Sequence, residues 1–289
     1  MNNAEPAQQN LHLEKMRREW TSEPTVAAWR KWHAPFAECT RGVTDAILHA
    51  AMLTPGHHVL DLASGSGEPA LALAEAVGPE GHVTATDLGS EMLATAQHHA
   101  TQKALHNMTF RQANAESLSF PDAAFDRVTC RFGVMFFPDH VRALRESRRV
   151  LNPGGRAVFV AWGSPEQPFF SCTAGILKKY AEIPPPEPGA PHVFRFAAPG
   201  TLRAAMEQAG FSAVREEALS ITLTWPGSPE LFWEHFQEIA APFRPFIQAL
   251  APDSYQRMSA EVLAALQPYC RGGHVTLPAS IVLVTGMRA

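Results

Sequence analysis

The stretch VLDLASGSGEPALALA, residues 59–74, decides the fold of this chain. It begins as an apolar run short enough to be a buried strand, and it continues through the small residues of 63–67. Glycine in such a turn lets a ligand approach the backbone closely, because no Cβ stands in the way. Glu68-Pro69 then opens a helix with an apolar side. A strand, a glycine turn and a helix N-terminus together present free N–H groups, so we expect a polar or anionic ligand here.

The glycine turn by itself leaves the ligand open. Residues 65–70 also fit the loose GxGxxA form of a dinucleotide-binding fingerprint, and a turn of this kind can equally be a plain tight loop. The neighbouring segments have to decide between these alternatives.

Composition and charge narrow the class of protein. The chain has 289 residues, of which 46% are hydrophobic, and this predicts a substantial core in one or two domains. The formal net charge is −4, with acidic and basic residues mixed along the chain. Proteins that grip a phosphate backbone usually carry a basic excess, so we expect a small-molecule partner and no nucleic acid.

The cysteines and the apolar runs suggest a cytoplasmic protein. Cys39, Cys130, Cys172 and Cys270 are far apart and form no CxxC pair, so we expect reduced thiols and no metal site. No apolar run approaches the roughly 20 residues of a membrane span, and no signal-peptide pattern opens the chain. We expect a monomer or a homodimer without a membrane span.

Strand-like and helix-like segments alternate after the glycine turn. Alternation at this spacing implies right-handed crossovers and a parallel sheet with helices on both faces. Ligands of such sheets lie outside the carboxyl ends of the strands. The predicted strands after the first are 82–87, 108–112, 125–130 and 156–162, and the predicted helices among them are 92–104 and 139–150.

The two ends of the chain are less regular. We expect a loose start up to about residue 22, then a helical segment 24–52 that is broken near Pro35. After residue 162 the pattern predicts a helix at 169–181, a proline-rich loop at 184–189, a helix at 200–210, a strand at 218–225, bulky helices at 228–269 and a last strand at 281–287.

With these segments placed, the chain resembles the class I S-adenosylmethionine-dependent methyltransferases, in the group of ubiquinone-biosynthesis and small-molecule enzymes. The matching elements, in order, are VLDLASGSGEPALALA, VTATDLGSEML, ANAESLSF with PDAAFDRV, RFGVMFFPD and LNPGGRAVFVAW. The resemblance implies an α/β, Rossmann-like, doubly wound seven-stranded sheet whose last strand is antiparallel between its neighbours. It also suggests an N-terminal helical cover (1–52), a methyltransferase core (53–227 and 275–289) and a helical lid insertion (228–274).

The resemblance assigns cofactor residues position by position. It implies that Asp61, Ala63, Gly65 and Gly67 surround the methionine moiety, with Ala63 standing where many members have glycine. Asp87 follows the turn by the roughly 20 residues at which an acid accepts hydrogen bonds from ribose hydroxyls. The remaining expected contacts are Leu88, Met92, Asn114, Ala115 and Glu116 around the adenine, and Arg131 and Phe132 beside the transferred methyl.

The catalytic and substrate residues are less sharply indicated. Related sugar and hydroxyl methyltransferases often have histidines where this chain has Met135-Phe136, so a general base is in doubt, and His33 and His140 are the only weak candidates. Aromatic side chains of the cover and lid suggest an apolar or aromatic acceptor, although a core role explains them equally well. The candidates for contact with the acceptor are Trp29, Trp32, Trp162, Phe169, Phe232, Trp233 and Phe236.

The sequence therefore predicts methyl transfer from S-adenosylmethionine, with S-adenosylhomocysteine as product, to a small acceptor on oxygen, nitrogen or carbon. Alignment and exclusion of water are the expected sources of rate enhancement. Two alternatives stay open, a non-catalytic cofactor-binding protein and an NAD-dependent oxidoreductase that uses the same glycine turn.

Overall fold

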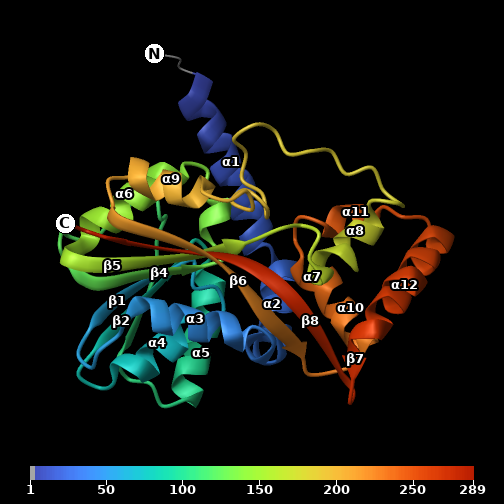
Figure 1. Ribbon diagram of the computed structural model, residues 1–289, viewed down its shortest axis with the longest axis horizontal. Coiled ribbons are helices and arrows are strands. Elements are labelled where there is room, and N and C mark those ends of the chain that lie inside the picture. Colours follow the sequence, from blue (N-terminus) through green and yellow to red (C-terminus); the bar gives the residue numbers. More distant parts are fainter. Residues whose placement is uncertain (1–3) are drawn as a thin grey trace.

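A twisted central sheet organises the molecule (Figure 1), and the computed structural model describes residues 4–289. The strand order is β3-β2-β1-β4-β5-β8-β6, and the short β7 pairs with β8. Strands β1 to β5 run parallel, whereas β8 is antiparallel to both β5 and β6. The strands are β1 His58–Leu62, β2 His82–Asp87, β3 Met108–Gln112, β4 Phe125–Arg131, β5 Leu151–Trp162, β6 Ser212–Trp225, β7 Cys270–Arg271 and β8 His274–Met287.

The predicted doubly wound sheet with its last strand antiparallel between its neighbours is confirmed, with two differences. The two-residue β7 makes the sheet eight-stranded. Strands β6 and β8 are also longer than predicted, because they pair from Ser212↔Met287 to Trp225↔Val275, well past the end of β5. The helices that connect β6 to β8 lie at the far ends of these two strands (Figure 1).

Helices cover both faces of the sheet, as right-handed crossovers require. One face is packed by α3 Arg41–Ala51, α4 Ala70–Val77 and α5 Ser90–Gln102, and the other by α6 His140–Val150 and α9 Thr201–Gln208. Helix α6 begins where predicted, because Asp139 Oδ1 accepts a hydrogen bond from Arg142 N, 2.9 Å away. Helix α4 begins at Ala70, just after the predicted opening Glu68-Pro69, with Pro69 at its N-cap.

The N-terminal region differs from the prediction. The expected loose start is wrong for the described part, because α1 Ala4–Thr21 is a helix, while residues 1–3 lie outside the described residues. Burial of Met16 and packing of Trp20 on Phe136, with ring centroids 5.1 Å apart, hold α1 against the protein. The predicted helical segment 24–52 is broken once, but the break lies at Thr40 and not near Pro35. Helix α2 Glu23–Cys39 continues through Pro35, and Trp32 and Phe36 on its inner face are buried in the core.

The segment after β5 is also more broken than predicted. Two short helices, α7 Pro168–Ser171 and α8 Ala174–Leu177, replace the expected single helix 169–181. Thr173 separates them, and its Oγ1 donates to the carbonyl of Phe169 at 2.7 Å. Between β6 and β7 lie α10 Pro229–Ile239, α11 Arg244–Gln248, α12 Pro252–Leu266 and the 3-10 turn η2 Gln267–Tyr269.

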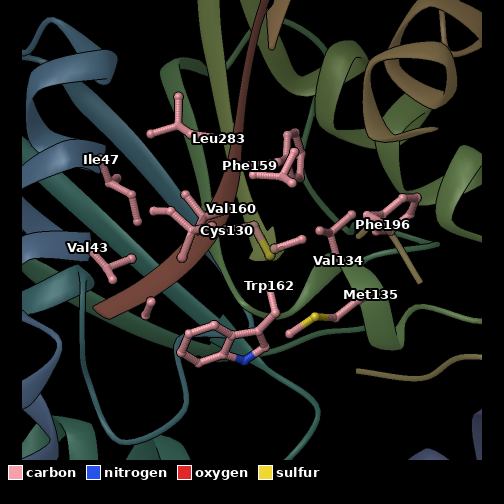
Figure 2. Packing of buried hydrophobic residues seen from close by; sticks show 14 of the residues in the cluster. Val43, Ile47, Cys130, Val134, Met135, Phe159, Val160, Trp162, Phe196 and Leu283 are labelled. Atoms are coloured by element: carbon pink, nitrogen blue, oxygen red, sulfur yellow. The ribbon is translucent and has the colours of Figure 1, made fainter. Parts of the chain in front are cut away.

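A large apolar core joins most of these parts, and a smaller cluster packs α4 against β1 and β2. Figure 2 shows Val43 and Ile47 of α3, Phe159 and Val160 of β5, and Leu283 of β8 in the large core. The buried aromatics of α10 belong to the same cluster as the sheet residues, so the helices between β6 and β7 share the core of the sheet. Within residues 4–289, no helix is both long and apolar enough to cross a membrane.

Candidate functional site

A pocket opens at the carboxyl ends of β1, β2, β4 and β5, below α1 and α2. It holds about 1500 Å³ of space, part of it open to solvent. Its polar half is lined by Ser64, Gly65, Ser66, Glu68, Thr86, Asp87, Asn114, Glu116 and Arg131. Its apolar half is lined by Leu13, Met16, Trp20, Trp29, Phe36, Met135, Phe136, Phe137, Phe169, Phe170, Phe236 and Phe243.

The two glycines of the turn have different tasks. Gly65 has φ +52°, lines the pocket, and an added Cβ would meet no protein atom within 4 Å, so the pocket is open beside it. Gly67 has φ +128° and does not line the pocket, and a Cβ there would come within 2.8 Å of Leu71 Cδ1. Gly67 therefore serves the close packing of the turn on helix α4. Ala63 lines the pocket with a left-handed φ of +53°.

Asp87 ties the end of β2 to the glycine turn. Its Oδ2 accepts from Gly65 N and its Oδ1 accepts from Gly89 N, both at 2.9 Å. Burial raises the pKa of this carboxyl, and the backbone N–H groups oppose that rise. Each oxygen retains a lone pair for a ligand hydroxyl, and Leu88 and Met92 line the pocket next to it.

Asp61 lies beneath the pocket and does not line it. The side chain is fully buried, and its Oδ1 accepts from Thr129 Oγ1 at 2.6 Å. Its Oδ2 has no partner among the described residues. Burial raises the pKa of Asp61 to about 7. Of the residues expected around the methionine moiety, the pocket thus brings together Ala63 and Gly65, while Asp61 and Gly67 support them from below.

The segment expected at the adenine lies on the pocket wall. Asn114, Ala115 and Glu116 all line the pocket. Asn114 Oδ1 accepts from Glu116 N at 3.0 Å, and Glu116 Oε1 accepts from Asp139 N at 2.9 Å. Burial raises the pKa of Glu116.

The end of β4 lies where the two halves of the pocket meet. Arg131 Nη1 donates to Thr40 Oγ1 at 3.0 Å and to Thr44 Oγ1 at 3.1 Å, and burial lowers the pKa of this guanidinium. The next residue, Phe132, has an unusual φ of +60° and stacks on Trp162, with ring centroids 4.0 Å apart. Such a conformation in a bulky residue is costly and is typical of functional sites.

The pocket also includes a carboxylate to which the sequence reading assigned no role. Glu68 follows the glycine turn and lines the pocket, and burial raises its pKa while the positive charge of Arg131 lowers it. Its position in the motif VLDLASGSGEPALALA could have suggested this.

The predicted acceptor residues divide into two groups. Trp29, Trp162, Phe169 and Phe236 line the pocket, whereas Trp32, Phe232 and Trp233 do not. Trp32 Nε1 donates to Glu238 Oε2 at 2.6 Å, and Trp233 Nε1 donates to Ser259 Oγ at 3.1 Å. Both indoles therefore contact other helices and not the pocket. Helix α10 can place Trp233 there because it buries residues on more than one of its faces.

Several wall residues were missed by the sequence reading. Leu13, Met16 and Trp20 of α1 line the pocket, and their spacing of three and four residues is a helical signal that could have found them. Ile239 is the last residue of α10, Pro242 and Phe243 follow it, and nothing local in the sequence marks them as pocket residues.

The two weak catalytic candidates lie outside the pocket wall. His33 stacks on His99 with ring centroids 3.7 Å apart, and its Nδ1 is 2.9 Å from Ser66 Oγ. His99 Nδ1 lies 3.0 Å from the carbonyl of Ser66 and must donate, since a carbonyl only accepts. Burial lowers the pKa of His33 to about 3 and that of His140 to about 4, and His140 faces Phe196.

These residues fit the cofactor that the resemblance implies. Gly65 leaves open space where a side chain would intrude, and Asp87 offers acceptors beside it. Arg131 and Glu68 offer opposite charges for an amino-acid moiety, which carries both signs. Within residues 4–289, no group of three or more metal-ligating side chains is found.

Comparison with known proteins agrees with this geometry. Residues 38–182 match the model of the ubiE/COQ5 methyltransferase family. A demethylmenaquinone methyltransferase of Listeria monocytogenes serotype 4a (strain HCC23) is 41% identical over 113 residues, 39% of this chain and 48% of that protein. The ubiquinone/menaquinone biosynthesis C-methyltransferase UbiE of Pseudoalteromonas translucida (strain TAC 125) is 39% identical over 117 residues, 40% of this chain and 47% of that protein. This chain thus spans about half the length of the curated relatives it matches.

A solved structure supports the fold over a longer range. The YcgJ protein of Bacillus subtilis has a TM-score of 0.56 and 22% identity, with 85% of this chain and 97% of that chain covered. At this identity, the likeness establishes the shared fold alone.

Proposed function

The chain belongs to the ubiE/COQ5 methyltransferase family of S-adenosylmethionine-dependent enzymes, and on that premise we propose that it methylates a small aromatic, quinone-like acceptor. The observation that carries the proposal is one pocket with two unlike halves that meet at Arg131 and Phe132. The polar half suits the cofactor, and the aromatic half suits an apolar ring system.

The chain's residues would bind, align and dehydrate the reactants. Bound S-adenosylmethionine supplies a methyl group on a positively charged sulfonium. Asp87 and the segment Asn114–Glu116 would hold the nucleoside, and Arg131 with Glu68 the amino-acid end. Holding two reactants in line can contribute up to about 7–11 kcal/mol to lowering the barrier. The stacked rings of Phe132 and Trp162 would face the positive charge and exclude water.

We further propose carbon as the methylated atom. Neither His33 nor His140 lines the pocket, so no histidine is placed to take a proton from an acceptor hydroxyl. A ring carbon next to an ionised oxygen is already nucleophilic and needs no base at the moment of transfer. The new C–C bond would form as the S–CH3 bond of the sulfonium breaks and S-adenosylhomocysteine leaves, and the ring carbon would then lose its proton to solvent at the open side of the pocket. The printed name of the Pseudoalteromonas relative, a C-methyltransferase, supports this choice.

The proposal also assigns a role to the predicted cover and to the predicted lid. Helices α1 and α2, within the predicted cover 1–52, supply Trp20 and Trp29 to the roof of the pocket. The predicted lid 228–274 supplies Phe236 and Phe243 to the apolar half. We propose that both segments shield the acceptor from water.

The test is a calorimetric titration with S-adenosylmethionine, S-adenosylhomocysteine and NAD, followed by turnover of reduced 1,4-naphthoquinones. We expect micromolar binding of the first two, none of NAD, and a product that gains one methyl group by mass spectrometry. Binding of NAD alone would favour an oxidoreductase. Cofactor binding without transfer to any quinol would favour the non-catalytic alternative.

A further inference from the structure

Two indole N–H groups in the wall of the apolar half have no hydrogen-bond partner. Trp20 Nε1 of α1 and Trp29 Nε1 of α2 are buried, and neither finds an acceptor among the described residues. Both side chains line the pocket, and their ring centroids are 6.3 Å apart. Two neighbouring orphaned donors in one wall are unusual, because native proteins rarely bury a donor without a partner.

Packing holds both rings in place. Trp20 contacts Phe136 with ring centroids 5.1 Å apart, and Trp29 meets Phe36 edge-on at 5.3 Å. These neighbours are phenylalanines and offer no hydrogen-bond acceptor. The carboxylates Asp87, Glu116 and Glu68 lie in the polar half, and the first two already accept from backbone N–H groups. Because both indoles line the pocket, a ligand bound there is placed to supply the missing partner.

An indole only donates, so the partner has to be an acceptor atom. We infer that Trp20 and Trp29 donate hydrogen bonds to a ring oxygen of the methyl acceptor, a carbonyl or phenolate, and so select oxygenated aromatic compounds. This inference rests on the proposed function for the nature of the acceptor. Hydrogen bonds to an ionised oxygen are about twice as strong as neutral ones. The two indoles would thereby favour the ionised acceptor, whose ring carbon is the nucleophile.

The test compares binding of two probes that differ by one oxygen, 1-tetralone and tetralin, to the full chain saturated with S-adenosylhomocysteine. The variants are Trp20→Phe and Trp29→Phe, which keep an aromatic ring and remove the donor. Trp225→Phe is the matched control, because Trp225 Nε1 is also buried without a partner but the residue does not line the pocket. Calorimetry measures each affinity, and thermal melting checks that each variant folds.

We expect the wild-type chain to bind 1-tetralone at least about tenfold more tightly than tetralin, since a site with donors rejects a ligand that leaves them unpaired. Each pocket variant should lower the affinity for 1-tetralone about five- to twentyfold and leave tetralin within about twofold, as loss of one hydrogen bond implies. The Trp225→Phe control should change neither. Equal affinities for the two probes in the wild-type chain, or an equal loss of both in the variants, would overturn the inference.

The hydrogen bonds from Trp20 and Trp29 and the proposed methylation can be confirmed or overturned independently. Oxygen-dependent binding through Trp20 and Trp29 without methylation of any quinol would remove the proposed reaction and keep the inference. Methylation of a quinol with an unchanged KM in both variants would support the proposed reaction and overturn the inference. If Trp20→Phe does not fold, Trp29→Phe on the neighbouring helix carries the same comparison.

Discussion

The two halves of the pocket are built in different ways. The polar half comes from one continuous part of the chain, residues 63–131, and hydrogen bonds such as those of Asp87 hold it in shape. The apolar half is assembled from α1, α2, residues 135–137, α7 and the end of α10, so that Leu13 and Phe243 line the same pocket. Ring packing holds this half together. The difference predicts that binding of S-adenosylmethionine and binding of the proposed acceptor can be altered separately.

The largest expected effect belongs to Gly65 in the polar half. Gly65→Val places a branched side chain in pocket space that no protein atom occupies. We expect S-adenosylmethionine to bind more than about 100-fold more weakly, a loss of about 3 kcal/mol, measured by calorimetry. Gly272→Val is the control, because Gly272 has a similar φ of +58° with open space around it but lies in the β7–β8 turn. Equal loss of binding in both variants would show that strain alone is responsible.

The next largest effect concerns His235, which packs behind the apolar half. This fully buried side chain stacks on Trp225, neither ring nitrogen has a partner among the described residues, and burial lowers its pKa to about 3. The unfolded chain takes up the proton near the ordinary pKa of 6.5, before the native state does. The stabilising contribution is therefore complete above pH 6.5 and falls by about 1.4 kcal/mol per pH unit as the pH drops toward 3.

Urea unfolding of the wild type and of His235→Phe at pH 7.5 and pH 4.5 measures this contribution. Between pH 7.5 and pH 4.5, the free energy of unfolding should fall by about 3 kcal/mol less in the variant than in the wild type. An equal fall in the free energy of unfolding in both proteins would contradict the assignment of this pH dependence to His235. Binding of S-adenosylmethionine at pH 7.5 should be the same in both, because His235 does not line the pocket.

Asp87 tests the polar half at a single side chain. Asp87→Ala leaves Gly65 N and Gly89 N without their acceptor and removes the expected ribose contact. We expect a loss of about 1–3 kcal/mol in binding of S-adenosylmethionine, measured by calorimetry, with 1-tetralone affinity unchanged. Asp126→Ala is the control, since Asp126 Oδ2 also accepts from a backbone N–H, that of His58, but does not line the pocket. An unchanged cofactor affinity in Asp87→Ala would remove this residue from the site.

The smallest effect is expected at Ala63, where the turn stores backbone strain. Its φ of +53° lies in the left-handed region that disfavours a side chain. Ala63→Gly should raise the free energy of unfolding by about 0.5–1 kcal/mol, because relief of the strain exceeds the extra entropy of an unfolded glycine. Ala123→Gly, at the same φ of +53° and away from the pocket, should gain a similar amount. A destabilised Ala63→Gly would show that its methyl group contributes packing that the turn needs.

Sequence reasoning succeeded where the signal is local. The five parallel strands, helix α6 with its Asp139 cap and the pocket position of Asp87 all follow from patterns within a few residues. It failed where packing overrides a local preference. The proline at position 35 does not break α2, because the aromatic residues around it are buried. The polar N-terminal segment is helical because Met16 and Trp20 pack on distant residues.

The sequence by itself thus determined the sheet, the glycine turn and the polar half of the pocket, because each depends on contacts between neighbours or on the regular crossover of strands and helices. Tertiary structure alone decided which aromatic side chains face the pocket. Trp29 and Phe236 line the pocket, whereas Trp32 and Phe232, on the same two helices, lie in the core. Periodicity shows that such residues are buried, but only the position and rotation of each helix determine whether they face the pocket or another helix.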